Sequence, residues 1–404
     1  MKYAESPGIE LVRCVLNAGE RGTALDADGV TVKNSVMLGG SVFKGMISLT
    51  DANISGNLQM AGTRIKPSSA GFAADSGRLL GFRMTIGGSF IPRFGFEADR
   101  LFLAGSHFAS GIQMIEATVG MGDEDATFDL RDVTVEGGVV IKRSRINAPL
   151  NAENSTIAGT LTLSGEFGAP GHASLSMQAA NIDVLHVEEG TRFLGEVDLS
   201  YSRVRVLDDD LAAWPSTIDL AGFSYEALAD DPRTGHKGRL EWIRKQKHGP
   251  LPQPYEQLAA IYRSSGHASE AQRILIAMND DSRSRLPRMA RAWSWVTRLL
   301  VGYGYQPWLA GVWLAGLLFI STAIFQMEHP EHVKIIKPDE GHPKFNPFIY
   351  ALDKTLPVLN LGHQQFFFST GFAGYWEWIT TAAGWIFGAA LAASLAGFVK
   401  RGGS

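Results

Sequence analysis

The stretch Leu25-Asp-Ala-Asp-Gly-Val-Thr-Val32 decides the fold, because its pattern returns every 11 residues as far as Ile65. Apolar residues alternate with outward polar ones, so that Leu25 and Ala27 flank Asp26. Such alternation is typical of a short β-strand with one buried face. The template has four inward positions. The first holds Leu25, Val36, Ile47 and Leu58, and the second holds Ala27, Leu38, Leu49 and Met60. The third holds Val30, Ser41, Ala52 and Thr63, and the fourth holds Val32, Phe43, Ile54 and Ile65. An internal repeat of this regularity indicates a solenoid, whose coils share one core.

Two short faces in each 11 residues predict a coil of 22 residues with four faces. We expect a right-handed, pentapeptide-like β-solenoid built from 11-residue half-coils. The template returns at Leu101, Ile112, Phe128, Val139, Leu150 and Leu161, and more weakly at Leu175 and Val197. About nine coils, each rising by ~4.8 Å, would form a rod of roughly 43 Å. We expect Lys66–Gly88 and Gly165–His172 to leave the stack as loops.

The amino-terminal residues predict a cap and a cytoplasmic location. Ile9–Leu16 could form a short helix that covers the first coil. Met1–Gly19 has no apolar core typical of a secretory signal. Cys14 is the sole cysteine of the 404 residues, which excludes a disulfide within the chain. We therefore expect six segments: cap 1–23, cytoplasmic solenoid 24–229, helical neck 230–300, first membrane span 301–327, extracytoplasmic loop 328–374, and second span with a short tail 375–404.

The neck is basic and helical. Residues 231–300 carry 13 Lys/Arg and 6 Asp/Glu, although the whole chain has a net charge of −4. Tyr255, Leu258 and Tyr262 share one helical face, and Ile274 and Met278 mark a second helix. The pair resembles a single tetratricopeptide-type hairpin, and a packed neck is favoured over a peptide-binding groove.

Arginines and tryptophans then interleave, as in a helix that lies in a membrane interface. A basic segment beside a span is expected to contact anionic lipid, and this interpretation is favoured over nucleic acid because no nucleic-acid motif accompanies it. The predicted lipid-headgroup contacts are Arg283, Arg285, Arg288, Arg291, Arg298, Trp293 and Trp295.

Two long uncharged stretches predict membrane spans. Trp308–Met327 has 20 residues, which at 1.5 Å each would cross about 30 Å of hydrocarbon. Trp378–Val399 has 22 residues. Arginines precede the first stretch and Lys400-Arg401 follows the second, so the positive-inside rule places both ends in the cytoplasm. The sequence therefore predicts a multi-pass protein of the cell inner membrane.

The second span carries a small residue at every fourth position. Small side chains let helix backbones approach closely. The stripe consists of Gly384, Gly388, Ala392 and Ala396. It predicts helix packing or homo-oligomerisation, with Gly311 and Ala315 of the same chain or a second copy of the span as the partner.

A short amphipathic helix is expected between the spans, and Pro357 should bend or end it. This helix could lie flat on the outer leaflet, or re-enter the membrane and line a pore among subunits. The residues of this possible pore or interfacial helix are Phe348, Leu352, Asp353, Lys354, Thr355, Leu356 and Asn360. No potassium-channel filter motif is present in the loop.

Motifs for catalysis are missing from the sequence. It contains no dinucleotide fingerprint, Walker loop, GxSxG or HExxH. His329-Pro-Glu-His332 is more typical of a solvated loop than of a metal site. Asp208-Asp-Asp210 is expected to be an exposed turn. We therefore expect a non-enzymatic protein with no cofactor, no metal and no catalytic residue.

Several stretches resemble a bacterial family often labelled "membrane-associated oxidoreductase". They are Leu220-Ala-Gly-Phe-Ser-Tyr225, Arg239-Leu-Glu-Trp242, Pro254-Tyr-Glu-Gln-Leu-Ala259, Gly302-Tyr-Gly-Tyr305, Tyr350-Ala-Leu-Asp353 and Leu356-Pro-Val358. The resemblance covers about the carboxy-terminal half. It implies a cytoplasmic solenoid with two spans and, by its label, redox chemistry, but it assigns no cofactor-binding residue.

Three functional hypotheses follow. The first is a non-enzymatic recognition or scaffold protein, tethered to the membrane, with a protein partner on the solenoid and homo-oligomerisation through its spans. The second is a homo-oligomeric ion channel or pore gated through the solenoid. The third is the oxidoreductase that the family label names.

Overall fold

The computed structural model describes residues 2–19, 22–68, 77–121, 125–229, 235–306, 308–336, 343–356 and 361–401. The chain divides into two compact units, Met1–Ile274 and Leu275–Ser404. Each unit is described by itself.

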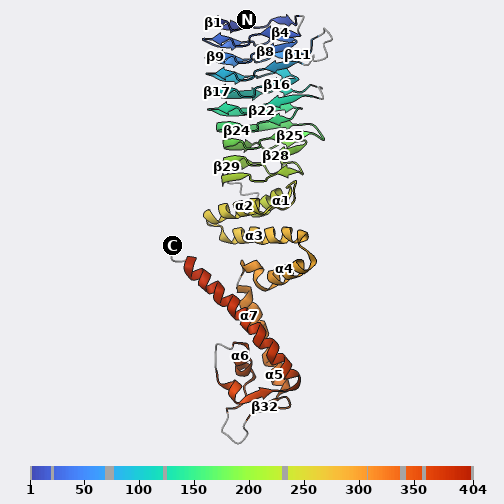
Figure 1. Ribbon diagram of the computed structural model, residues 1–404, viewed down its shortest axis with the longest axis vertical. Coiled ribbons are helices and arrows are strands. Elements are labelled where there is room, and N and C mark those ends of the chain that lie inside the picture. Colours follow the sequence, from blue (N-terminus) through green and yellow to red (C-terminus); the bar gives the residue numbers. More distant parts are fainter. Residues whose placement is uncertain are drawn as a thin grey trace. The chain divides into compact units, whose positions relative to one another are not determined.

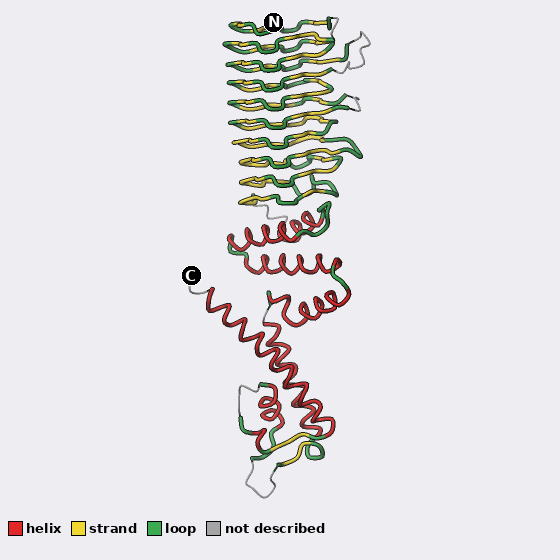
Figure 2. Tube along the Cα trace, in the orientation of Figure 1, coloured by secondary structure: helices red, strands yellow, loops and turns green. Residues whose placement is uncertain are grey.

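The first unit is a β-solenoid of about ten turns, in which coil follows coil along one axis (Figures 1 and 2). One parallel ladder holds nine strands. They are β4 (Thr23–Asp26), β8 (Met46–Ser48), β12 (Arg78–Leu80), β16 (Arg100–Phe102), β20 (Thr127–Asp129), β23 (Leu150–Asn151), β25 (Ala173–Ser176), β28 (Glu196–Asp198) and β30 (Ile218–Asp219). The other faces of the coils join into a parallel sheet of 22 strands. They are β1 (Glu5–Ser6), β2 (Ile9–Glu10), β3 (Val15–Asn17), β5 (Thr31–Val32), β6 (Val36–Met37), β7 (Val42–Lys44), β9 (Asn53–Ile54), β10 (Leu58–Gln59), β11 (Arg64–Lys66), β13 (Thr85–Ile86), β14 (Ser89–Ile91), β15 (Glu97–Ala98), β17 (His107–Phe108), β18 (Gly111–Ile115), β19 (Thr118–Val119), β21 (Thr134–Val135), β22 (Gly138–Ile146), β24 (Thr156–Phe167), β26 (Asn181–Val187), β27 (Arg192–Phe193), β29 (Arg203–Asp209) and β31 (Ser224–Leu228).

The register confirms the four-faced coil of 22 residues. Leu25 pairs with Ile47 and Val36 pairs with Leu58, so equivalent positions stack one coil apart. All sixteen positions of the template between Leu25 and Ile65 are buried. The alternation therefore identified the core, because each inward side chain rests on the side chain of the neighbouring coil.

One turn in each half-coil requires a left-handed backbone. Gly29, Gly40 and Gly62 adopt φ of +64°, +68° and +65°, and Asp51 takes the equivalent position with φ +58°. Each lies one residue before the third inward position of the template. Glycine adopts this conformation without steric cost, whereas another residue loses about 1–2 kcal/mol. The glycines thus allow the chain to turn after a strand of only two to four residues.

Small hydroxyl side chains at the turns occupy core positions without leaving polar atoms unpaired. Thr63 Oγ1 donates to the carbonyl of Leu38 at 2.8 Å, and Ser41 Oγ donates to the carbonyl of Leu11 at 2.7 Å. A buried hydroxyl is tolerated when it is hydrogen-bonded. Serine and threonine therefore fit the third inward position.

One local prediction was wrong, and two predicted loops were too wide. Ile9–Leu16 is not a helix, because β1, β2 and β3 form a first coil that pairs with β5, β6 and β7. Within the expected loop Lys66–Gly88, strands β12 and β13 belong to the stack. Within Gly165–His172, Phe167 ends β24 and is buried. In the last two cases the 22-residue spacing resumes after an insertion, which displaces the pattern along the sequence.

Helices cover the carboxy-terminal end of the stack. α1 (Gly235–Arg244) and α2 (Pro252–Ser264) follow the last coil (Figure 1). Gln253 Nε2 donates to the carbonyl of Phe223 at 2.8 Å, and Gln257 donates to that of Tyr225. Residues 245–247 extend the nine-strand ladder by pairing with Ile218. These contacts satisfy the last sheet edge, which a solenoid must cover. The sequence did not predict α1, because its glycines obscure the helical pattern.

We expect a Phe128→Ala substitution to destabilise the solenoid by about 3–5 kcal/mol, because it leaves a cavity in a core that cannot collapse. Phe128 is fully buried and lies between Leu101 and Leu150 in the ladder. The measurement is the free energy of opening from amide hydrogen exchange in β16, β20 and β23. The exposed Thr134→Ala on a neighbouring strand is the control. Equal exchange in both variants would contradict the assignment of the core.

The second unit is helical. α3 (Ala268–Ser282) crosses the division between the units and is followed by a 3₁₀ turn at Arg283–Arg285. Next come α4 (Arg288–Val301), a 3₁₀ turn at Gly302–Gly304 and α5 (Trp308–Glu328). β32 (Val333–Ile335), α6 (Pro347–Thr355), a 3₁₀ turn at His363–Gln365, β33 (Phe367–Ser369) and α7 (Gly371–Arg401) complete it. Its core holds Phe325, Val333, Tyr350, Ala351, Phe367 and Ala373.

The predicted neck helices at Tyr255 and Ile274 are confirmed as α2 and α3. Within the part of the chain that the structure describes, α5 alone is long and apolar enough to cross a membrane. The second predicted span, Trp378–Val399, lies in one continuous helix, α7, but its role as a span is not confirmed.

Candidate functional site

A polar cluster fills the packing between α6 and α7. Lys354 Nζ lies 2.6 Å from Glu377 Oε1, and both side chains are largely buried. Tyr350 Oη donates to Glu377 Oε2 at 3.2 Å and lies 2.8 Å from Ser369 Oγ. Thr381 Oγ1 donates to the carbonyl of Lys354 at 3.1 Å. Ionisable groups are placed in such a position only with partners, and here each has one.

The chain that leaves α6 is held by Asp353. Its side chain is fully buried, and its two carboxylate oxygens accept the amides of Leu361 and Gln364 at 2.9 Å each. Asn346 caps the start of α6 by accepting the amides of Phe348 and Ile349. Charge-assisted bonds to backbone amides are among the stronger hydrogen bonds. Asp353 therefore fixes the segment that returns from α6.

α6 differs from an ordinary amphipathic helix, because polar side chains are buried and some apolar side chains are exposed. Its buried side chains are Tyr350, Ala351, Asp353 and Thr355. Phe348 is exposed, and Leu352 and Leu356 are partly exposed. Lys354, also on α6, faces Glu377 of α7. The predicted site residue Asn360, like Pro357, lies outside the described residues.

The small-residue stripe on α7 is only partly used. A Cβ on Gly384 would lie 1.7 Å from the carbonyl oxygen of Thr355, so α6 contacts the bare backbone of α7 here. At Gly388, a Cβ would meet none of the described atoms within 4 Å, and Ala392 is exposed. The side chain of Ala396 is not among the described ones. Thus α6, which the sequence did not suggest, is the contact of Gly384.

A cavity of about 210 Å³ opens beside this cluster, lined by Asp353, Lys354, Gln364, Glu377, Trp378 and Thr381. Two carboxylates and one ammonium line it. The sequence contained little indication of this cavity. Glu377 immediately precedes the apolar stretch Trp378–Val399, Thr381 lies within it, and neither residue belongs to a recognisable motif.

The predicted lipid contacts around α4 divide into two groups. Arg283 and Arg298 form ion pairs with Asp280 at 2.8 and 2.9 Å, and the guanidinium of Arg283 stacks 4.1 Å from the ring of Trp295. This first group is engaged within the chain. Arg291 donates to the carbonyls of Ser284 and Leu286 at 3.1 Å. The second group, Arg288 and Trp293, is exposed, and the side chain of Arg285 is exposed as well.

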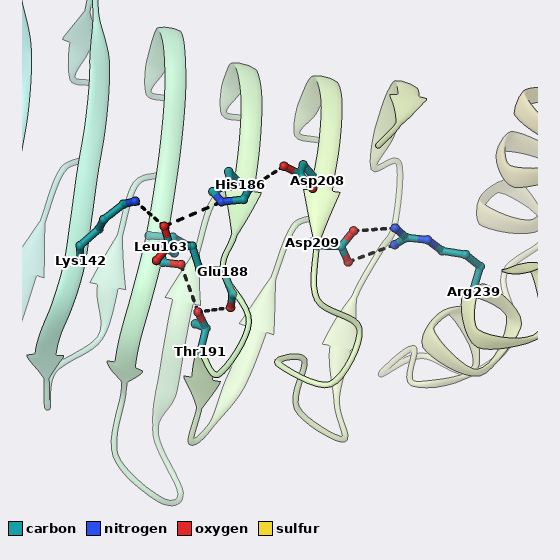
Figure 3. A network of polar contacts seen from close by, with 8 residues as sticks. All are labelled: Lys142, Leu163, His186, Glu188, Thr191, Asp208, Asp209 and Arg239. Atoms are coloured by element: carbon teal, nitrogen blue, oxygen red, sulfur yellow. Dashed lines mark hydrogen bonds and ion pairs between the residues drawn. The ribbon is translucent and has the colours of Figure 1, made fainter. Parts of the chain in front are cut away.

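The first unit carries a polar network on the outside of the solenoid (Figure 3). His186 Nδ1 lies 2.6 Å from Asp208 and its Nε2 lies 3.9 Å from Glu188. The ammonium of Lys142 bonds to Glu188 and holds the pKa of that carboxyl below its usual range. Asp208 therefore orients the ring through Nδ1, whereas Nε2 lies beyond hydrogen-bond distance of Glu188.

Asp209, next in sequence to Asp208, points into the core and corrects the expectation of an exposed turn at Asp208–Asp210. Arg239 of α1 donates to both of its oxygens at 2.7 and 3.0 Å (Figure 3). Trp214 Nε1 donates to Asp209 Oδ2 at 2.6 Å. Both members of the ion pair are almost completely buried. The pair joins the helical cap to the last coils.

Across the described ranges, no group of three or more His, Cys, Asp or Glu side chains is arranged to hold a metal ion. His332 instead lies 3.7 Å from Glu328, and the ring of His329 stacks on Phe345. No family model, curated protein or solved structure matches this chain.

Proposed function

We propose that this chain is a non-enzymatic recognition or scaffold protein that anchors a right-handed, pentapeptide-like solenoid to the inner membrane. In this proposal α5 and α7 span the bilayer, both chain ends are cytoplasmic, and the spans promote homo-oligomerisation. A protein partner binds the solenoid. Redox chemistry, which the family resemblance implies, is the alternative that a spectrum would reveal.

One observation carries the anchor: α5 is long, apolar and mostly unburied. Its exposed side chains include Trp308, Val312, Phe319, Ile320 and Met327. Water disfavours such a surface, whereas lipid accepts it. α7 adds exposed Trp378, Ile379, Trp385 and Ile386. The recognition role is supported by the stacked coils, because each face of a solenoid presents outward side chains in straight rows at about 4.8 Å intervals.

Reporter fusions test the anchor. We expect alkaline phosphatase to be active when it is fused after Ile336, between the helices, and inactive when it is fused to the carboxy terminus. A fluorescent protein at the carboxy terminus should fold and emit. The membrane fraction should retain the chain after alkaline carbonate washing. Release by carbonate, or active phosphatase at the carboxy terminus, would contradict the topology.

Recognition by the solenoid is tested in cells with a photo-crosslinking amino acid placed at outward positions of each face. We expect adducts to concentrate on one face. Adducts that are absent from all faces, or spread evenly, would contradict a docking role. A visible absorption band from a cofactor in the purified chain would favour redox function.

A second candidate, a homo-oligomeric pore, is favoured by the position of α6. Thr355 at the end of α6 contacts Gly384, which lies six residues inside the predicted span Trp378–Val399. Six helical residues correspond to about 9 Å of depth. A helix that lay flat on the leaflet would not reach this depth, so the contact favours the re-entrant placement. Two spans with a re-entrant helix are a plan that pores use.

Ion flux from liposomes that contain the purified chain tests the pore. Flux that is lost on Lys354→Met, in a variant whose α6 still packs against α7, would favour this candidate. Silent bilayers with correctly inserted protein would favour the scaffold.

A further inference from the structure

We infer that α4 is an interfacial helix that lies in the headgroup layer of the cytoplasmic leaflet, with its apolar face in anionic lipid. The inference rests on the proposed function, since it requires α5 to be in the bilayer. It adds a lipid-binding surface on α4 to the proposed function, and it states which face of α4 is directed toward the lipid.

The exposed face of α4 is apolar. Met289, Trp293, Leu299 and Val296 are 86%, 68%, 59% and 41% exposed. At 3.6 residues per turn these side chains share one side of the helix. A helix that buries its apolar side within the chain would show the reverse pattern.

The buried face of α4 is polar. Ser294, which is 9% exposed, donates to Tyr303 Oη at 3.1 Å, and Tyr303 donates to Asp280 at 3.0 Å. Ser294 lies roughly 150° around the helix from the centre of the apolar face. α4 is thus fixed by polar contacts to α3 and to the turn before α5. Its apolar face is directed outward.

The contact with α5 sets the depth of α4. Trp313 Nε1 donates to the carbonyl of Leu299 at 3.0 Å. Trp313 lies five residues after the start of α5, which corresponds to about 7.5 Å along the helix. If α5 spans the bilayer, its first turns occupy the interfacial layer. The bond therefore places the end of α4 in that layer as well.

Charge identifies the lipid as anionic. Arg288 is exposed and flanks the apolar face. Each arginine near an anionic surface strengthens binding by about fivefold. Indole rings such as Trp293 prefer the headgroup boundary. An apolar face flanked by exposed arginine fits an anionic lipid surface better than a protein groove.

Spin labels test the placement. Cys14 is the only cysteine, so a Cys14→Ser background permits single labels at positions 289, 293 and 296, with positions 291 and 294 as controls on the other side of the helix. The full chain is placed in vesicles that contain phosphatidylglycerol. We expect labels at 289, 293 and 296 to collide mainly with oxygen, and the control labels to lack this preference. Arg288→Gln should lower the ratio of inserted to uninserted α4 by about fivefold.

Two results would overturn the inference. Labels on the apolar face that collide mainly with a water-soluble nickel chelate would place α4 outside lipid. Immobile labels that neither agent reaches would show that protein covers the face. A label at position 312 of α5 separates the two proposals. If this label also avoids lipid, the proposal that α5 spans the bilayer is contradicted. If it reaches lipid while the α4 labels do not, only the inference about α4 has failed.

Discussion

In an Asp209→Ala variant, we expect the helical cap to separate from the solenoid far more readily than in the parent chain. The substitution leaves the guanidinium of Arg239 buried without a carboxylate, and Trp214 Nε1 without its acceptor. Removal of one member of a buried ion pair typically costs about 3–5 kcal/mol. Because 1.4 kcal/mol corresponds to a factor of ten, amide hydrogens in α1 and β30 should exchange roughly 100-fold faster or more.

Two further variants separate the ion pair from general damage to the fold. In Asp209→Leu/Arg239→Met, both charges are replaced by apolar groups of similar size, and we expect most of the protection to return. In Asp183→Ala, an exposed ion pair with Arg205 is lost, and we expect no measurable change at α1. Exchange rates in α1 that do not respond to Asp209→Ala would show that other contacts hold the cap.

The sequence revealed the solenoid because its physical rule is local. A side chain at Leu25 faces inward because its neighbour faces outward, and the pattern persists through Val36, Ile47 and Leu58. The rule fails where the partner is distant in sequence. Asp209 looked like part of an exposed acidic turn, and its partner Arg239 lies 30 residues later on a helix that was not predicted.

The candidate site shows the same limit. The sequence identified α6, since its helical spacing is a local signal, but it did not identify Asn346 as the residue that caps the helix. It did not reveal that Asp353 and Lys354 face inward while Phe348 faces outward. It also did not reveal that Asp280 forms ion pairs with both Arg283 and Arg298. Side-chain type shows which partners are possible, but packing between helices decides which partner is present.

A Gly384→Leu substitution should displace α6 from α7, whereas Gly388→Leu should not. A side chain at Gly384 would start 1.7 Å from the carbonyl oxygen of Thr355, and a backbone atom cannot move away alone. Overpacking commonly costs about 1–3 kcal/mol, and contact with backbone falls at the upper end or beyond. Displacement of α6 would also break the bonds of Lys354 to Glu377 and Thr381. Gly388 has open space on the described surface and serves as the matched control.

Cysteine labelling measures this displacement directly. Ala351 is fully buried on α6, so Ala351→Cys in a Cys14→Ser background should react slowly with a maleimide in nanodiscs. We expect the reaction to accelerate at least about tenfold when Gly384→Leu is added, because a cost of 1.4 kcal/mol already produces that factor. It should remain slow with Gly388→Leu. Equal acceleration in both variants would show that the stripe acts as one surface toward another copy of the chain. Acceleration with Gly384→Leu alone would show that Gly384 serves α6, while Gly388 and Ala392 stay available for a partner helix.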